Sequence, residues 1–409
     1  MQGINKPLFR FAQSQIESLI DSGDSLLLLG PRQVGKTTLI NKLLETKSNT
    51  ITYPLQNPSV RQNMEVDPGR LIREIETFEK PPIVFIDEIQ KVPALFDAIQ
   101  LLIDNRKAKF ILTGSSARKL KRQGVNLLPG RVIYRRLDPM LWSELGLTKE
   151  SNIKELKIEH KSSISTYTFE DALIFGSLPL LIQASSEIKA DLLQSYSHIY
   201  LEEEIRAESI SRKIGSFARF LELAAHESGK NLNLTKLSFE SGVSLPTIKG
   251  YYQILEDTLI IERFDPFKKN ARKRILSSPR YYYFDIGVRN ALARLPLETG
   301  IIAAQKGILF EHFVILEILH RIRALNKSYR LYYWRTSGGA EVDCIIDCGN
   351  YVIPIEIKSS TSVRPGEIKG LKQFLSDYHS ISPIGYVISQ ASTKQKLANN
   401  IIMLPWFMM

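Results

Sequence analysis

Runs of consecutive apolar residues alternate with stretches of helical periodicity over the first 146 residues of the chain. Each apolar run ends in a short polar or glycine-containing segment, as in SLLLLG, PPIVFIDE and KFILTGSS. Strands that lack polar alternation are typical of a parallel sheet whose two faces are both covered by helices. The pattern therefore predicts an α/β fold with a parallel sheet in residues 1–146.

The pattern changes after Gly146. Residues 147–165 are rich in Lys, Ser and Glu and low in large apolar residues, which is typical of a linker. Residues 166–295 are mostly helical in pattern, and residues 296–409 return to a mixture of strand and helix signals. The sequence therefore predicts an α/β domain, a linker, a helical middle domain and a C-terminal α/β domain.

The middle domain contains two predicted helices around a turn at Gly242, with Ser244 as the cap of the second helix and strands after it. This order is typical of a winged helix, in which Thr247, Lys249 and Tyr252 would lie on the exposed recognition helix. A basic run at the wing would bind phosphates without sequence preference. Its basic residues are Lys268, Lys269, Arg272, Lys273 and Arg274. The alternative is a helical module that packs between the other domains and carries a solvated charged loop.

Two alternating runs in residues 340–360 flank Gly349-Asn350, a dipeptide that suits a tight hairpin turn. The turn sets the register of the two strands. One face of the hairpin is then apolar, and on it Val342, Cys344, Ile346 and Cys348 lie opposite Ile357, Ile355, Ile353 and Tyr351. We expect this face to belong to the core.

The other face of the predicted hairpin places Asp343 opposite Glu356 and Glu341 opposite Lys358. Facing carboxylates repel each other, but a divalent cation between them turns the pair into a favourable site. We therefore expect Asp343 and Glu356 to bind Mg²⁺, with Lys358 placed to orient a water nucleophile or to stabilise charge on a phosphate. The alternative is a Glu341–Lys358 pair beside a solvated Glu356.

The stretch LLLLGPRQVGKTTL contains the complete GxxxxGK[ST] motif between an apolar strand and a helical pattern. In this motif backbone N–H groups wrap the phosphates of a nucleotide, Lys36 reaches the β- and γ-phosphates, and Thr37 ligates Mg²⁺. Asp87 and Glu88 end a later buried strand, where Asp87 would hold Mg²⁺ through water and Glu88 would orient the attacking water. The expected loop residues are Gly30, Pro31, Arg32, Gln33, Val34, Gly35, Lys36, Thr37 and Thr38.

Two further polar signals are less specific. The strand KFILTGSS ends in hydroxyl groups, among which Ser115 is expected to sense the γ-phosphate, although Ser and Thr are also ordinary turn residues. Arg131 is the expected arginine finger for the transition-state charge, and Arg118 and Arg135 compete for that role. A solvated surface arginine is the alternative.

Charge and composition narrow the range of partners. The 409 residues carry a formal net charge of +11 with a pI near 9.4, which favours an acidic partner such as nucleic acid. No apolar run approaches the ~18 residues of a membrane span and no cleavable leader is evident, so a cytoplasmic protein is expected. The six histidines and two cysteines show no zinc-ligand spacing.

The motifs GPRQVGKTTL, VFIDEIQ, ILTGSS and LPGRV, with YYWRTSGGAEVDCII and IPIEIKSS far downstream, resemble an AAA+ type P-loop ATPase family whose ATPase domain is followed by a C-terminal domain of unknown function. The resemblance covers nearly the whole chain. ATPases of this architecture use ATP and Mg²⁺ and often work as oligomers, so it implies a homo-oligomer or a protein partner.

The set Asp343, Glu356 and Lys358 resembles the core of PD-(D/E)XK nucleases, which implies a restriction-endonuclease-like α/β fold for the C-terminal domain. In such nucleases the preceding helix usually adds an acidic ligand, and Glu311 matches that place, although Glu317 on the same helix competes. The expected function is an ATP-hydrolysing AAA+ protein that acts on DNA and has a magnesium-dependent nuclease-like domain. The alternative is a nucleotide-switched regulatory or defence-related scaffold whose C-terminal domain does not cleave.

Overall fold

A computed structural model of the chain describes residues 8–115, 128–148, 156, 158, 164, 166–207, 214–268 and 278–409. The chain divides into two compact units. The first comprises Met1–Asp138 and Ile254–Ile260, and the second comprises Pro139–Gln253 and Ile261–Met409. Apart from Ile254–Ile260, the predicted middle and C-terminal domains therefore lie in one unit, and most of the predicted linker lies outside the described residues.

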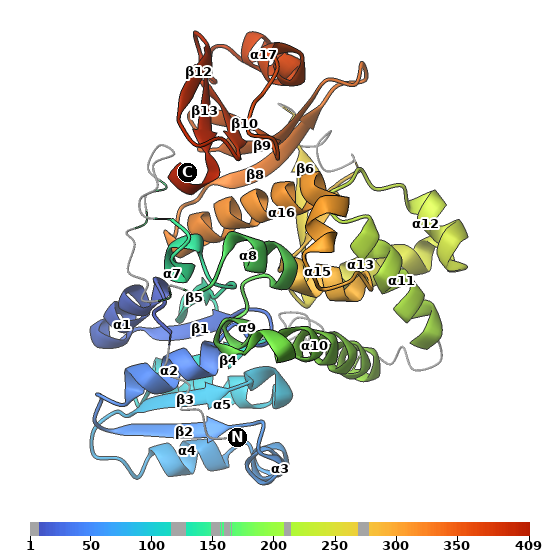
Figure 1. Cartoon of the computed structure of the whole chain (residues 1–409). Coiled ribbons are helices and arrows are strands. Elements are labelled where there is room, and N and C mark those ends of the chain that lie inside the picture. The colour runs from blue at the N-terminus through green and yellow to red at the C-terminus, as the bar shows by residue number, and fades with distance from the viewer. Residues whose placement is uncertain are drawn as a thin grey trace. The chain divides into compact units, whose positions relative to one another are not determined.

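The first unit is built on a five-stranded sheet in the order β2-β3-β4-β1-β5, in which all neighbouring strands run parallel (Figure 1). The predicted parallel α/β fold is confirmed. The strands are β1 Ser25–Leu29, β2 Thr50–Pro54, β3 Ile83–Asp87, β4 Lys109–Gly114 and β5 Val132–Arg136.

Helices cover both faces of this sheet. They are α1 Ala12–Ser22, α2 Lys36–Leu44, α3 Pro58–Val66, α4 Arg70–Ile75 and α5 Leu95–Asp104, with the 3-10 turn η1 Ile89–Lys91. Leu27 and Leu29 belong to a core shared with α3, α4 and α5, whereas Leu26 and Leu28 are equally buried on the other face of β1. The apolar runs of the sequence reflect this burial on both sides.

The second unit contains an eight-stranded mixed sheet in the order β12-β13-β11-β10-β9-β8-β6-β7. The pairs β6–β8, β10–β11 and β11–β13 are parallel, and the others are antiparallel. The sheet therefore crosses the domain boundary expected at residue 296, because β6 and β7 precede it. The strands are β6 Ile261–Pro266, β7 Arg280–Tyr283, β8 Arg330–Arg335, β9 Glu341–Asp347, β10 Val352–Lys358, β11 Gly385–Ser389, β12 Gln395–Ala398 and β13 Ile401–Pro405.

Helices make up most of the remaining second unit. They are α7 Trp142–Leu145, α8 Phe169–Phe175, α9 Pro179–Gln183, α10 Ser186–Ala207, α11 Ile214–His226, α12 Leu234–Ser241, α13 Leu245–Asp257, α15 Ile286–Leu292, α16 Gly300–Ala324 and α17 Lys369–Asp377, with the 3-10 turns η3 Pro365–Ile368 and η4 Trp406–Met408. The end of α13 belongs to the first unit. None of the helices in the described part of the chain combines the length and the apolar character that crossing a membrane requires.

The hairpin of β9 and β10 has the predicted register from Cys344 to Asp347, with Ile346 opposite Ile353 and Cys344 opposite Ile355. The predicted pairs of Val342 with Ile357 and Asp343 with Glu356 are not part of this ladder, because β9 shifts its register against β8 at this end and Val342 joins the core of Ile345. Its turn places Gly349 at φ 89°, a conformation that glycine adopts without strain. The burial extends further than predicted, since Ile345 on the other face is also fully buried. The reason is that α16 packs on β10 while α17 packs on β9 and β10.

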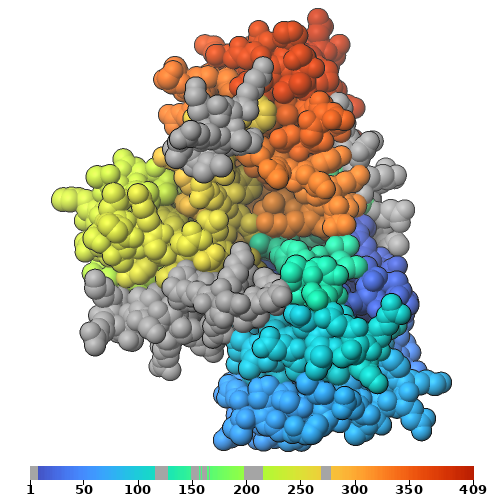
Figure 2. All heavy atoms as spheres, turned by 180° about the vertical axis from the view of Figure 1, so that it is seen from behind, coloured from blue at the N-terminus to red at the C-terminus, as the bar shows by residue number. Residues whose placement is uncertain are grey.

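The helices α11, α12 and α13 precede the antiparallel pair β6–β7, which is the element order that the winged-helix prediction requires. Figure 2 shows the three helices in yellow-green to yellow. Phe239 of α12 is 90% exposed. Lys249 is exposed as expected. Tyr252 is not: it is buried and stacks on Tyr281 of β7 at 4.6 Å between ring centroids, because its ring joins α13 to the sheet. Of the basic run, only Lys268 lies among the described residues.

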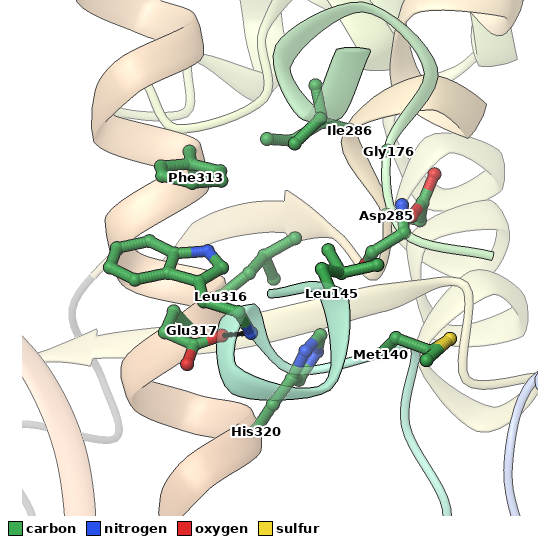
Figure 3. Close-up of a pocket in the computed structure, with 12 residues that line it drawn as sticks. Met140, Leu145, Gly176, Asp285, Ile286, Phe313, Leu316, Glu317 and His320 are labelled. Carbon is green, nitrogen blue, oxygen red and sulfur yellow. Dashed lines mark hydrogen bonds between the residues drawn. The ribbon is translucent and has the colours of Figure 1, made fainter. Parts of the chain in front are cut away.

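A buried ion pair lies among aromatic rings in the second unit. Trp142 stacks on Phe313 with centroids 4.2 Å apart, and Glu317 binds Arg321 at 2.6 Å. The backbone N–H of Trp142 donates to Glu317 at 3.1 Å, beside a cavity of about 20 Å³, the size of one water molecule (Figure 3). Glu317 is therefore held in an internal ion pair and does not compete with Glu311 as a metal ligand.

Gly176→Ala is expected to destabilise the second unit. Gly176 has φ 77° and ψ −147°, and an added Cβ would lie 2.1 Å from Oδ1 of Asp285. We expect a loss of about 3 kcal/mol of unfolding free energy, measured by urea denaturation. Gly250→Ala in α13 is the control, because beyond its chain neighbours and the backbone of its own helix nothing lies within 4 Å of its added Cβ, and a helix favours alanine by about 1 kcal/mol. A native unfolding midpoint for Gly176→Ala would contradict this account.

Candidate functional site

The loops that carry the predicted nucleotide-binding residues meet at one edge of the parallel sheet. Since β1, β3 and β4 run parallel, their carboxyl ends lie at the same edge, where they lead into Gly30, Glu88 and Ser115. Ligands of open α/β sheets bind at this edge. The strand topology thus brings together segments that are far apart in the sequence.

The loop between β1 and α2 has the backbone that a phosphate-binding loop requires. Gln33 at φ 62° and Gly35 at φ 90° both adopt left-handed conformations. A Cβ at Gly30 would lie 2.2 Å from the carbonyl oxygen of Leu137, so this position accepts glycine alone unless the backbone shifts. Because α2 begins at Lys36, the N–H groups of its first turn are available to an anion.

Lys36 is folded back onto its own loop. Nζ donates to the carbonyl oxygens of Gly30 and Pro31, both at 2.8 Å, and the side chain is 5% exposed. Burial lowers the pKa of Lys36 to about 8, although the charges of Glu88 and Asp87 act to raise it. An anion at this place would stabilise the charged form that burial disfavours.

Asp87 joins the loop to the neighbouring strands. Oδ1 accepts hydrogen bonds from the hydroxyls of Thr37 at 2.8 Å and Thr113 at 2.6 Å, and Oδ2 accepts from the amide of Gln56 at 3.4 Å. Carboxylate and hydroxyl oxygens are the ligands that Mg²⁺ prefers, so Thr37 and Asp87 form a donor set that fits this ion. These two residues are the predicted magnesium ligands of the loop.

Glu88 follows β3 in a sparsely populated backbone conformation, with φ 60° and ψ 50°. Its Oε2 accepts hydrogen bonds from the hydroxyl of Ser115 at 3.0 Å and from the amide of Gln90, which also donates to Ser115 at 3.1 Å. Ser115 is therefore a neighbour of the predicted catalytic carboxylate. Gln90 is not among the predicted residues, and the signal for it is its place in VFIDEIQ, two residues after Glu88.

Arg131 lies at the amino ends of the parallel strands, opposite the carboxyl ends where the loop lies. It directly precedes β5, whose first residue Val132 pairs with Ser25 at the start of β1, about one strand length (roughly 13 Å) from the loop. Its guanidinium binds Asp104 with contacts of 2.6 and 3.0 Å. Within one chain this arginine is therefore remote from the phosphate loop. Its competitor Arg118 lies outside the described residues.

Two arginines that no motif marks lie at the same edge as the loop. Arg136 ends β5 opposite Leu29 of β1, close enough for its charge to act on Lys36. Arg10 precedes α1 and donates to the carbonyl oxygen of Val34 at 2.6 Å. Only the pairing of β5 with β1 and the packing of the segment before α1 reveal these two residues.

A second group of predicted residues lies on the β9–β10 hairpin. Asp343 accepts a hydrogen bond from the backbone N–H of Ile357 at 2.7 Å, and Lys358 donates to Oε1 of Glu356 at 2.6 Å. Burial, and then the charge of Asp343, raise the pKa of Glu356 to about 9, while Lys358 acts to lower it. Burial also raises the pKa of Asp343. These carboxylates are therefore poorly stabilised as anions in the absence of a cation.

Neighbouring strands and α16 complete this carboxylate cluster. Glu311 accepts a hydrogen bond from the hydroxyl of Tyr282 at 2.6 Å, and burial raises the pKa of Glu311 to about 7. Arg280 binds Glu341, so the alternative pairing of Glu341 with Lys358 does not form. Arg280 and Tyr282 belong to β7 and are not among the predicted residues, although they stand in the stretch SPRYYYFD.

The cluster offers few protein ligands for a metal ion. Among the described residues, no three His, Cys, Asp or Glu side chains are grouped closely enough to hold a metal ion, so Glu311, Asp343 and Glu356 do not form a three-ligand set. Oε2 of Glu356 is buried and has no hydrogen-bond partner in the described part of the chain. Since Mg²⁺ is commonly held by one or two carboxylates and water, Asp343 and Glu356 fit this ion.

Curated relatives of the chain are themselves uncharacterised. A protein of Mycobacterium tuberculosis is 26% identical over 360 residues, which cover 86% of this chain and 74% of that protein. A protein of Methanocaldococcus jannaschii is 24% identical over 422 residues, which cover 94% and 84%.

Solved structures match the chain at low similarity. A Walker-type ATPase of Pyrococcus abyssi aligns with a TM-score of 0.45 and 13% identity, over 69% of this chain and 94% of that chain. AMPPCP-bound DnaA from Aquifex aeolicus aligns with a TM-score of 0.31 and 12% identity, over 61% and 89%.

Family models match three successive parts of the sequence. Residues 166–299 match a domain of unknown function (DUF8612), and residues 306–408 match another (DUF4143). Residues 22–146 match a model described as an AAA domain. Together with the parallel sheet and its glycine loop, this match makes residues 22–146 an AAA-type domain with a P-loop ATPase fold.

Proposed function

We propose that the AAA-type domain binds ATP with Mg²⁺ through residues 30–38 and hydrolyses the nucleotide. The observation that carries this proposal is the contact of Thr37 with Asp87 at 2.8 Å, beside Lys36 at the start of α2. P-loop ATPases use this combination of groups to hold Mg²⁺ and the β- and γ-phosphates. The left-handed backbone at Gln33 and Gly35 supports the proposal, since such turns direct successive N–H groups towards one anion.

In this proposal Glu88 orients the attacking water. Its carboxylate accepts hydrogen bonds from Gln90 and Ser115 and must release them before it can accept one from water. These two residues would therefore control when Glu88 can orient the attacking water. Arg131 lies remote from the loop of its own chain and would act on the nucleotide of a second copy, as arginine fingers supplied in trans do. The active form would then be a homo-oligomer.

Lys36→Ala is expected to abolish ATP binding, because it removes the ammonium group that meets the phosphates. Glu88→Gln is expected to bind ATP but to lose turnover, since the phosphate loop stays intact while the orientation of water is lost. Calorimetry and phosphate release measure the two effects. Lys42→Ala is the control, because Lys42 lies on the same helix but contacts Gln13 at 3.2 Å. Native ATP affinity in Lys36→Ala would refute the assignment.

The affinity for ATP is expected to fall as the pH rises through about 8, which is the lowered pKa of Lys36. Below this pH the ammonium form is already present. Above it, binding must carry a proton to Lys36, so the affinity declines by up to about tenfold per pH unit. Calorimetry in buffers of different ionisation enthalpy measures the decline and the proton uptake together. An affinity that stays constant from about pH 7 to about pH 10 would contradict this role.

A second candidate function is magnesium-dependent cleavage of DNA by the carboxylate cluster of the second unit. It is favoured by the buried Oε2 of Glu356, which has no partner among the described residues, and by Lys358 at 2.6 Å from Oε1. Asp343 and Glu356 would hold Mg²⁺, which when bound polarises a phosphate and lowers the pKa of water. Lys358 would stabilise the charge that develops on the phosphate.

DNA is the proposed polymer partner because the chain has a net charge of +11 and a basic run after β6. The proposed winged-helix module would present this run to phosphates. The alternative proposal is a nucleotide-switched scaffold, in which the cluster binds a cation without cleaving and the AAA-type domain regulates a partner. The two proposals differ in whether DNA is cut.

The native chain is expected to bind Mn²⁺ without nucleotide, and Asp343→Asn is expected to lose this binding, because the cluster then has one carboxylate fewer. Electron paramagnetic resonance of free Mn²⁺ measures the change. Asp347→Asn is the control, since Asp347 lies at the far end of β9 and accepts from the N–H of Gly349 at 3.0 Å. Failure of the native chain to bind Mn²⁺ would refute the site, and Mn²⁺ binding without DNA cleavage would favour the scaffold.

A further inference from the structure

Arg10 stands before α1, outside every motif of the sequence, and yet its side chain is only 6% exposed. Nη1 donates to the carbonyl oxygen of Val34 at 2.6 Å, and Nη2 donates to the carbonyl oxygen of Asp138 at 2.7 Å. One planar guanidinium therefore bridges the phosphate loop and the segment that follows β5. Such a bridge requires the fixed fork of an arginine, which a lysine does not have.

The first of these carbonyls belongs to a part of the loop with left-handed backbone on both sides. Val34 lies between Gln33 at φ 62° and Gly35 at φ 90°. In a trans peptide the C=O bond and the N–H bond of the next residue lie in one plane and point in opposite directions. A guanidinium that holds the Val34 carbonyl on one side of the loop thus also holds the N–H of Gly35 on the other side. This N–H is one of the donors that a phosphate loop offers to its anion.

The residue that carries the second carbonyl is anchored through its side chain. Oδ1 of Asp138 accepts a hydrogen bond from Nε of Arg136 at 2.8 Å, and both side chains are at most 10% exposed. Next to it, the N–H of Leu137 donates to the carbonyl oxygen of Leu29 at 2.9 Å, which extends the pairing of β5 with β1. The segment at the far end of the Arg10 bridge is therefore anchored to β1, the strand that leads into the phosphate loop.

We infer that Arg10 is a positioning residue for the nucleotide: by bridging Val34 and Asp138 it fixes the peptide plane that presents the Gly35 N–H to the phosphates. This inference rests on the proposed nucleotide binding by the same loop. Arg10 does not contact the ligand in this role, and it acts through the loop backbone. Loss of the bridge should therefore lower the affinity for every ligand that places a β-phosphate in the loop.

Arg10→Lys tests the inference with ADP as the probe. We expect the dissociation constant for ADP to rise by about 10- to 100-fold, which is the range for losing a charge-assisted hydrogen bond to a buried carbonyl. Titration calorimetry is run at a temperature at which circular dichroism shows the variant to be folded. Arg61→Lys is the control, because Arg61 pairs with Glu65 on the surface of α3 at 3.8 Å.

Arg10→Ala provides a second variant, in which added methylguanidinium is expected to restore ADP affinity by filling the vacated place. A residue with only a structural role would lower the melting temperature and leave the dissociation constant of the folded variant unchanged, and that result would overturn the inference. Failure of both variants to fold even with methylguanidinium would also assign Arg10 a purely structural role. Failure of the native chain to bind ADP would instead refute the proposed nucleotide site.

Discussion

The parallel alignment of β1 with its neighbours is the constraint on which the nucleotide site depends. Because the strands share one direction, the loop after β1, the acidic pair after β3 and the hydroxyls at the end of β4 reach the same edge. Asp87 can then accept from Thr37 of one segment and Thr113 of another. The same alignment requires both faces of the sheet to be covered, which accounts for the helices on each side and for the uniformly apolar strands.

Burial favours the neutral form of the side chain at both candidate sites, and it therefore shifts the two pKa values in opposite directions. It lowers the pKa of Lys36 in the first unit and raises the pKa of Glu356 in the second, because in each case the neutral form is favoured away from water. A phosphate beside Lys36, or a cation beside Glu356, would restore the charged form. Each site is therefore arranged so that binding of an oppositely charged ligand relieves a desolvation penalty.

Sequence patterns predicted a structural feature correctly where that feature depends on residues close together in the chain. The glycine loop was predictable because its spacing, its left-handed turns and the start of α2 all arise within a few residues. The register of the β9–β10 hairpin was predictable because a two-residue period and the turn at Gly349 leave one alignment of the apolar face. Tyr252 was misplaced for the complementary reason: its burial depends on Tyr281, which belongs to a strand beyond the helix.

The sequence by itself determined the α/β class, the glycine loop with the acidic pair that follows a later strand, and the register of the β9–β10 hairpin from Cys344 to Asp347. Only the tertiary structure decided that β6 and β7 complete the C-terminal sheet, that Arg131 lies at the edge remote from the loop, and that Gln90, Arg10 and Tyr282 contact the predicted residues. The physical reason is one of range. Turn geometry, strand period and helix starts are set by neighbours along the chain, whereas strand order and the burial of a charge are set by segments that meet only when the chain has folded.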